Sequence, residues 1–183
     1  IIQRIVEPMH KHLSSQEIPY RGVLFIGLMI DQHDDPYVVE FNVRFGDPEC
    51  QVTLPLLKTD MYSLLHGAAT DGLADVELEL HAGSAVTVVL ASEGYPASPI
   101  KGRSLDGLAS LVAKTTYGQA WVNFAGVSTD ANGNFIASGG RVLSCTALGE
   151  DLLSTQQSAY QLMSKIQLEG GHFRTDIAHR AID

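Results

Sequence analysis

The first stretch of the chain carries apolar residues at the three- and four-residue spacing that gives a helix one apolar face. These residues are Ile1, Ile2, Ile5, Val6, Met9 and Leu13. The pattern predicts the second part of a helix that ends near residues 13–15. Pro8 lies inside the pattern, where it either kinks the helix or marks where its regular part starts. The chain also begins with Ile1 and not with Met. We therefore expect a fragment, a processed chain or a chain cut inside a helix.

Two apolar runs separated by a polar turn follow this helix. The first run covers residues 23–30 without a break, and the second covers residues 37–42. The segment between them, residues 31–36, contains three Asp residues and one Pro, which is typical of a turn. The pattern predicts an antiparallel hairpin with a connection of five or six residues.

Shorter elements are expected after the hairpin, and strands dominate beyond Asp75. The expected elements are helices at about 51–57 and 60–70, with Asp60 as N-cap and Gly72 as stop, strands at 85–91, 120–127, 134–137 and 141–147, and a helix at about 151–166. A turn at residues 130–134 should join two of these strands as a hairpin. We expect an α/β (α+β) fold with a boundary near residues 73–82.

Composition and charge narrow the possible functions. The 183 residues are 45% hydrophobic, which is typical of a folded globular chain, and the net charge is −9. An acidic chain is a poor match for nucleic acid, and no apolar run reaches the roughly 18 residues of a membrane span. The two cysteines, Cys50 and Cys145, fit neither a disulfide framework nor a zinc site. We expect reduced thiols in a cytoplasmic protein with no nucleic-acid or membrane partner.

Candidate chemistry gathers at the end of the second hairpin strand. Glu40 and Asn42 are two residues apart, so a strand presents both on one face while Phe41 turns into the core. A carboxylate and an amide oxygen on a rigid strand suit Mg²⁺, which completes its coordination with phosphates and water. Arg44 would add a planar cation on the same face. The alternative is an exposed strand face that ends in a charged turn.

This segment also resembles a known family. Residues 40–51, followed by 54–60, closely resemble the glycinamide ribonucleotide synthetases, or phosphoribosylamine–glycine ligases, which are ATP-grasp enzymes of purine biosynthesis. Further matches in order and spacing are residues 20–29, Gly94-Tyr95-Pro96, Lys101-Gly102, residues 139–143, residues 173–177 and residues 180–182. The resemblance covers essentially the whole chain. One departure is Phe124-Ala125-Gly126-Val127, where the family usually has His-Ala-Gly-Thr.

The resemblance implies the fold and the activity. Residues 1–77 would be the C-terminal portion of an ATP-grasp domain, and residues 78–183 a small β-rich C-terminal domain. The parent enzyme would use ATP and Mg²⁺, or Mn²⁺ in its place, to join glycine to 5-phosphoribosylamine. The N-terminal part would lie before Ile1 and act as a partner, so we expect the isolated chain to be inactive. Two alternatives are another ATP-grasp carboxylate–amine ligase and a non-catalytic fragment for metal–nucleotide binding or assembly.

The resemblance also implies roles for residues of the first half. Glu40 and Asn42 would be the metal ligands, and Arg44 would steady the reacting phosphoryl or carboxylate group. Asp47 would face an amine, either the glycine ammonium or the attacking nucleophile. Val39 could touch the adenine ring, although a buried strand valine is the default interpretation.

In the second half, Gly139, Gly140 and Arg141 combine a backbone open to close approach with a cation, which suits the phosphate of the phosphoribosyl group. The alternative is a glycine pair in a turn with a solvated Arg141. Lys101 is a weaker candidate for the same phosphate, and its alternative is a mobile surface loop.

Overall fold

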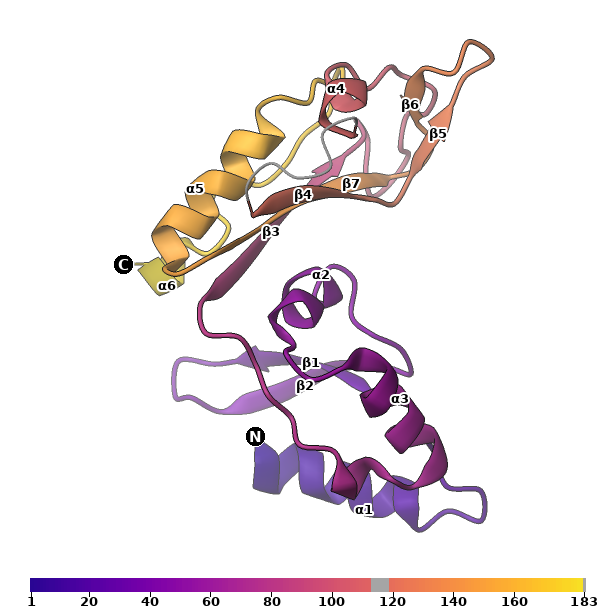
Figure 1. Ribbon diagram of the computed structural model, residues 1–183, viewed down its shortest axis with the longest axis vertical. Coiled ribbons are helices and arrows are strands. Elements are labelled where there is room, and N and C mark those ends of the chain that lie inside the picture. The colour runs from indigo at the N-terminus through magenta and orange to yellow at the C-terminus, as the bar shows by residue number, and fades with distance from the viewer. Residues whose placement is uncertain (113–118, 183) are drawn as a thin grey trace. The chain divides into compact units, whose positions relative to one another are not determined.

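Two units make up the chain in the computed structural model, which describes residues 1–112 and 119–182 (Figure 1). Unit 1 consists of Ile1–Asp47 and Lys58–Glu79, and unit 2 consists of Pro48–Leu57 and Leu80–Asp183. The break at Glu79 lies close to the boundary expected from the sequence. The segment Pro48–Leu57, however, belongs with the later residues. Helices and sheets occur in both units, which confirms the mixed fold class.

Unit 1 begins with a helix whose geometry changes at Pro8. A π-helical stretch, η1 (Ile2–Val6), precedes the regular helix α1 (Glu7–Ser14). Pro8 falls in the first turn of α1, where the fixed φ of proline suits a helix. Of the two alternatives for Pro8, the structure therefore confirms the start of the regular helix.

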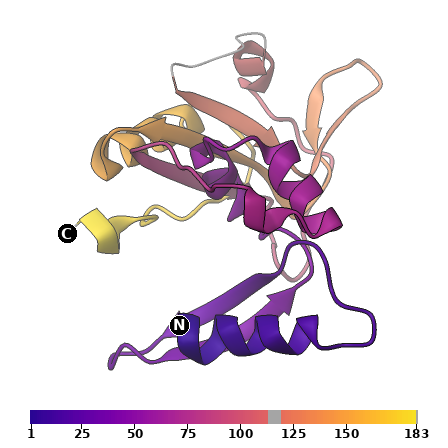
Figure 2. The same cartoon turned by 60° about the horizontal axis from the view of Figure 1, so that its bottom comes forward.

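The predicted antiparallel hairpin is confirmed. Strands β1 (Phe25–Ile30) and β2 (Pro36–Asn42) pair across a five-residue connection, residues 31–35. The Asp31 carboxylate accepts hydrogen bonds from the amides of His33 and Asp35, at 2.8 and 2.9 Å, and closes the turn. The pairing shifts by one residue at Gly27, so Val39 is an extra residue on β2. Figure 2 shows α1 running alongside this hairpin.

Of the two helices expected between residues 50 and 75, the first is shorter than expected and the second is confirmed. Helix α2 (Cys50–Thr53) gives way to the 3₁₀ turn η2 (Leu54–Leu56) at Pro55, and α3 (Met61–Thr70) is followed by the turn η3 (Leu73–Asp75). Asp60 caps α3 as predicted, and hydrogen bonds from Ser63 lower the pKa of its carboxyl. The helix stops at Asp71, which adopts the left-handed conformation, rather than at Gly72.

Unit 2 is built on a three-stranded antiparallel sheet in the order β3-β7-β4, which is covered on one face by a helix (Figure 1). The strands are β3 (Ser84–Ala91), β4 (Ala120–Phe124) and β7 (Arg141–Gly149), and the covering helix is α5 (Leu152–Met163). Smaller elements are α4 (Leu108–Val112), the hairpin strands β5 (Val127–Thr129) and β6 (Phe135–Ala137), and α6 (His179–Ile182). The predicted strand 120–127 is thus divided at Ala125 and Gly126.

The core of unit 2 lies between this sheet and α5. Val88, Cys145 and Val122 form one cross-strand row, and Leu108, Leu143 and Met163 are among the fully buried side chains. Burial raises the pKa of the Cys145 thiol to about 12. No helix among the described residues combines the length and apolarity needed to cross a bilayer.

Two positions on α5 offer a test of this core. Met163 is fully buried, whereas Leu153 is 48% exposed. We expect Met163→Ala to lower the free energy of unfolding by about 2–5 kcal/mol, because it leaves a cavity. Leu153→Ala should change it by less than about 1 kcal/mol. Urea unfolding followed by circular dichroism measures both, and equal losses for the two variants would contradict the packing described.

The two thiols should differ in reactivity. Cys145 is buried with a raised pKa, while Cys50 is only partly buried. At pH 8 we expect a thiol reagent such as DTNB to label Cys50 readily and Cys145 only after unfolding, because the thiolate is the reactive form. The Cys50→Ser variant isolates the signal of Cys145. Rapid labelling of that variant in its native state would show that the strand β7 is not buried as described.

Candidate functional site

The end of β2 places the two candidate metal ligands on one face of the hairpin. Glu40 lies opposite Gly27 on β1, and Asn42 lies opposite Phe25. Directly paired residues of antiparallel strands point to the same face, so both side chains share a face with Gly27 and Phe25. The structure therefore places Glu40 and Asn42 on the same face of the strand, as the two-residue spacing predicted.

Gly27 gives Glu40 the space that it occupies. A Cβ atom built on Gly27 would lie 3.0 Å from Cγ and 3.7 Å from Oε1 of Glu40. The Glu40 side chain therefore lies across the neighbouring strand at a position where no other side chain competes. The Glu40 side chain is exposed.

Arg44 extends this cluster beyond the strand. Its guanidinium donates to Oδ1 of Asn42 at 3.3 Å and to the backbone oxygen of Phe45 at 2.8 Å. The other amide atom of Asn42, Nδ2, is buried and has no hydrogen-bond partner among the described residues. A buried donor without a partner is costly, so this amide is unsatisfied in the chain as it stands.

These residues fit a hard divalent cation. Glu40 offers a carboxylate and Asn42 an amide oxygen, which is the donor set that Mg²⁺ or Mn²⁺ takes from a protein when phosphates and water complete the shell. The long contact from Arg44 is a weak competitor for the Asn42 oxygen. No group of three or more His, Cys, Asp or Glu gathers among the described residues, so a site made wholly of such side chains is not found in that part of the chain.

Two neighbouring residues are more exposed than the sequence suggested. Phe41 lies on the opposite face from Glu40, but it is 47% exposed, so the expectation that it enters a core is wrong. Val39 is 65% exposed, and its default interpretation as a buried strand valine is also wrong. The physical reason is that the hairpin has only two strands and little packed against it. Asp47 is exposed in the loop that ends this part of unit 1.

In unit 2, the candidate phosphate-binding residues sit where three loops meet. The backbone oxygens of Gly139 and Gly140 accept hydrogen bonds from the side chain and the amide of Ser92, each at 2.8 Å. Arg141 follows at the start of β7 and is partly buried. The exposed Lys101 is close in the fold, because the amide of Gly102 donates to Ala137 at 2.7 Å.

Both glycines also have a packing role. A Cβ atom on Gly139 would lie 3.0 Å from Cα of Gly126, so these two backbones pack closely. A Cβ atom on Gly140 would lie 2.5 Å from the ring of Tyr95. Packing alone therefore accounts for glycine at 139 and 140, and their role toward a ligand stays a prediction. The structure groups Glu40, Asn42 and Arg44 within unit 1, and Lys101 with residues 139–141 within unit 2.

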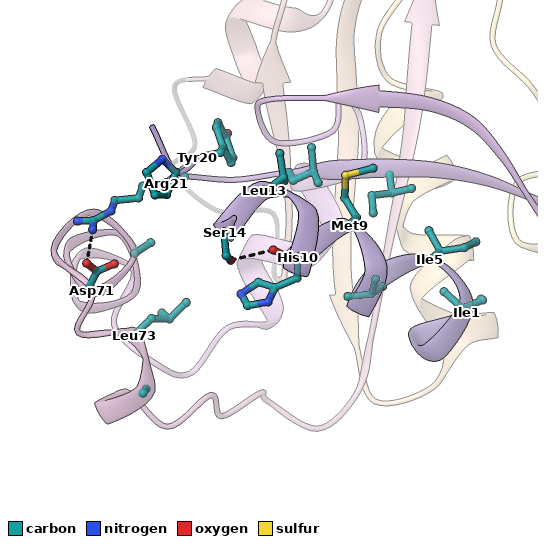
Figure 3. A pocket seen from close by; sticks show the side chains of 18 of the residues that line it. Ile1, Ile5, Met9, His10, Leu13, Ser14, Tyr20, Arg21, Asp71 and Leu73 are labelled. Carbon is teal, nitrogen blue, oxygen red and sulfur yellow. Dashed lines mark hydrogen bonds and ion pairs between the residues drawn. The ribbon is translucent and has the colours of Figure 1, made fainter. Parts of the chain in front are cut away.

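The sequence reasoning missed a large cavity in unit 1. It has a volume of about 810 Å³ and lies between α1, the hairpin and the end of α3 (Figure 3). Met9 and Leu13 project from α1 toward the hairpin, and an ion pair between Arg21 and Asp71 lies at one end. The apolar stripe of the first helix was the available signal. Glu40 and Asn42 do not line this cavity.

Comparison with known proteins matches both parts of the chain to domains of one enzyme. The family model described as the phosphoribosylglycinamide synthetase C domain matches residues 85–180, and that of the ATP-grasp (A) domain of the same enzyme matches residues 1–50. The chain is 44% identical over 184 residues to the phosphoribosylamine–glycine ligase of Mycobacterium tuberculosis, with all of the chain and 41% of the relative covered. It is 41% identical to the trifunctional purine biosynthetic protein adenosine-3 of Gallus gallus, covering 17% of that protein.

A solved structure matches the chain as well. The crystal structure of phosphoribosylamine–glycine ligase from Thermotoga maritima matches 96% of the chain and 42% of its own length, with a TM-score of 0.71 and 34% identity. The chain thus spans about two fifths of the ligases that it matches. The matched C-domain model alone covers more than half of the chain, from residue 85 to residue 180. The chain therefore belongs to the phosphoribosylglycinamide synthetase family, with residues 1–50 matching its ATP-grasp (A) domain and residues 85–180 its C domain.

Proposed function

We propose that the chain supplies the metal-binding strand and the C domain of a phosphoribosylamine–glycine ligase. The reaction would join glycine to 5-phosphoribosylamine with ATP cleavage to ADP and phosphate, as a step of purine biosynthesis in the cytoplasm. The observation that carries this proposal is the placement of Glu40, Asn42 and Arg44 together at the end of β2. That strand lies inside the segment that matches the ATP-grasp model.

In this proposal Glu40 and Asn42 hold Mg²⁺, or Mn²⁺ in its place. Such an ion would supply the positive charge that offsets the charge of the nucleotide phosphates. The residues of the chain act mainly by position. Gly27 keeps the Glu40 carboxylate free to turn toward the ion, and Asn42 offers its Oδ1 once the 3.3 Å contact with Arg44 is released.

Arg44 and Asp47 would then handle the reacting groups. The Arg44 guanidinium is exposed, and it can hold a phosphoryl or carboxylate group through two parallel hydrogen bonds. The exposed Asp47 carboxylate would attract the ammonium of glycine or the amine of phosphoribosylamine. Val39, which is exposed on the bulged strand, offers an apolar contact for the adenine ring.

Unit 2 would bind the sugar phosphate. Arg141 and Lys101 provide the cations, and the backbone at Gly139 and Gly140 approaches the phosphate closely. The hydrogen bonds from Ser92 support this assignment, because they hold the loop that precedes Arg141 in a fixed conformation. The remaining partner of the site would be the N-terminal portion that the longer relatives possess.

A chimaeric enzyme tests the proposal directly. The chain replaces the matching part of the M. tuberculosis ligase, and ADP release is measured with ATP, Mg²⁺, glycine and phosphoribosylamine. We expect activity from the chimaera and none from the chain alone. Glu40→Gln should lower kcat/KM by at least about 100-fold, because it removes the charged metal ligand.

The control is Glu17→Gln, which removes an exposed carboxylate outside the proposed site. It should leave the rate unchanged. Activity with another small carboxylate but not with glycine would favour a different ATP-grasp ligase. An inactive chimaera that still binds Mg-ATP through Glu40 would favour the non-catalytic fragment, and full activity of Glu40→Gln would refute the metal site.

The role of Gly27 has its own test. The Gly27→Ala variant of the chimaera places a methyl group about 3.0 Å from Cγ of Glu40, so the carboxylate must shift. We expect the Mg²⁺ concentration for half-maximal rate to rise by about fivefold, equivalent to ~1 kcal/mol, with little change in the KM for glycine. Gly72→Ala, where no atom lies within 3.4 Å of the added Cβ, is the matched control. An unchanged Mg²⁺ requirement would remove Gly27 from the account.

A further inference from the structure

Arg103 joins three segments of unit 2 that are far apart in the sequence. Its backbone pairs with the end of β6, because the amide of Ala137 donates to the Arg103 oxygen at 2.9 Å. Its guanidinium forms an ion pair with the carboxylate of Glu93, which follows β3. The same nitrogen, Nη1, donates to the backbone oxygen of Glu169 at 2.6 Å, in the segment after α5. One residue therefore links the ends of two strands to the C-terminal segment.

The Arg103 side chain is more enclosed than that of an ordinary surface ion pair, because only 25% of it is exposed. A charged donor that binds a carboxylate and a backbone oxygen makes stronger hydrogen bonds than a neutral one. The Glu169 carboxylate contributes little, since it is 83% exposed and lies 3.9 Å from Nε of Arg103. The contacts that hold the guanidinium are therefore those with the Glu93 carboxylate and the Glu169 backbone.

Gly170 provides the space for this ion pair. Its φ of +65° lies in the left-handed region that favours glycine. A Cβ atom at this position would overlap both the Glu93 carboxylate and Nη1 of Arg103. The ion pair therefore lies directly against the backbone of Gly170, where any side chain would displace it.

The segment after α5 is fixed at both of its ends. The backbones of Gln167 and Asp106 exchange two hydrogen bonds of 3.0 Å, and those of His172 and Ala91 exchange two of 2.9 Å. The guanidinium of Arg103 binds this segment between the two pairs. The segment is therefore a fixed support, against which Arg103 can hold the loop that follows β3.

Through that loop, Arg103 reaches the glycines of the proposed sugar-phosphate site. Glu93 is the sequence neighbour of Ser92, which is buried. The amide and the hydroxyl of Ser92 donate to the backbone oxygens of Gly139–Gly140, each at 2.8 Å. A movement of Glu93 would therefore be passed to the residues that directly precede Arg141.

The backbone of Arg103 connects to the same site by a second route. Lys101, the other proposed cation, precedes Arg103 by two residues. The amide of Gly102, between them, donates to the Ala137 oxygen at 2.7 Å. Ala137 ends β6 and leads into residues 139–141. Both proposed phosphate-binding segments are therefore tied to Arg103.

We propose that Arg103 is a positioning residue for the phosphate of the phosphoribosyl group. Its backbone holds the Lys101 segment, and its ion pair with Glu93 holds the loop before Arg141, so both cations are kept in one arrangement. Ligand groups that are already ordered bind more tightly, because less entropy is lost on binding. The inference rests on the proposed function for the substrate. It goes further by assigning a residue that acts through its neighbours rather than by contact with the phosphate.

Ribose 5-phosphate, titrated into the isotopically labelled chain and followed by NMR, tests this role without the ligase reaction. We expect Arg103→Ala to raise the Kd by at least about fivefold, because the two segments lose their common anchor. Glu93→Ala should raise the Kd by a similar factor. If only charge mattered, removal of an acidic group would strengthen phosphate binding, so the direction of this change separates positioning from direct attraction.

Matched variants control for charge and for backbone strain. Glu169→Ala removes the carboxylate that lies 3.9 Å from Arg103 and should change the Kd by less than about twofold. Gly170→Ala should raise the Kd by at least about threefold, because it displaces the ion pair. Gly133→Ala, also at a positive φ but with no atom within 4 Å of the added Cβ, should not. Circular dichroism melts establish that each variant is folded during the titration.

Three results would overturn the inference. They are an unchanged Kd in Arg103→Ala, tighter binding by Glu93→Ala, and equal losses for Gly170→Ala and Gly133→Ala. Failure of the original chain to bind ribose 5-phosphate at millimolar concentrations would overturn both the inference and the sugar-phosphate site on which it rests.

The chimaeric enzyme separates this inference from the ligase activity. In the chimaera, Arg103→Ala should raise the KM for phosphoribosylamine by at least about fivefold, while kcat and the KM for glycine stay within about twofold. Binding of ribose 5-phosphate that depends on Arg103, together with an inactive chimaera, would support the inference and refute the proposed reaction. An active chimaera whose KM for phosphoribosylamine is unchanged in Arg103→Ala would do the reverse.

Discussion

The burial of apolar side chains governs this structure, and it is distributed very unevenly. In unit 2, the central strand β7 pairs with β3 on one side and β4 on the other, and α5 closes one face of the sheet. Val88, Cys145 and Met163 lose essentially all contact with water there. In unit 1, α1 and the hairpin present comparable apolar faces to an open cavity. The fully buried apolar side chains of the described residues therefore all belong to unit 2.

Polar interactions refine this arrangement on the second face of the unit 2 sheet. The indole of Trp121 donates to Asn123, whose amide donates to the Thr146 hydroxyl at 2.8 Å, and Thr146 is hydrogen-bonded to Thr87. Thr146 is fully buried, and this chain of hydrogen bonds crosses all three strands. Since a slip of one residue would turn these groups to the other face, the network favours a single register.

Much of the local structure follows from the sequence. Helical spacing in the first residues, the polar turn at 31–36 and the Asp60 cap each depend on neighbours within a few residues, so the sequence pattern predicts them correctly. The i, i+2 rule likewise places Glu40 and Asn42 on one face. Recognition of the family rests on the same short segments.

Other features depend on partners far along the chain, and the sequence pattern alone misses them. The exposure of Val39 and Phe41 reflects what packs on the hairpin rather than their own hydrophobicity. Gly126 matters because Gly139, which is distant in sequence, touches its backbone. The grouping of Pro48–Leu57 with unit 2 and the cavity of unit 1 arise in the same way, from contacts between segments.

In the proposed ligase, Glu40 and Asn42 together hold a divalent ion. Paramagnetic Mn²⁺ broadens the NMR signals of nearby amides, so its addition with ATP to the isotopically labelled chimaera locates the ion. We expect selective broadening of the amides around Gly27, Glu40 and Asn42, lost in the Glu40→Gln variant. Broadening centred on other residues, or identical broadening in that variant, would show that these residues do not hold the ion.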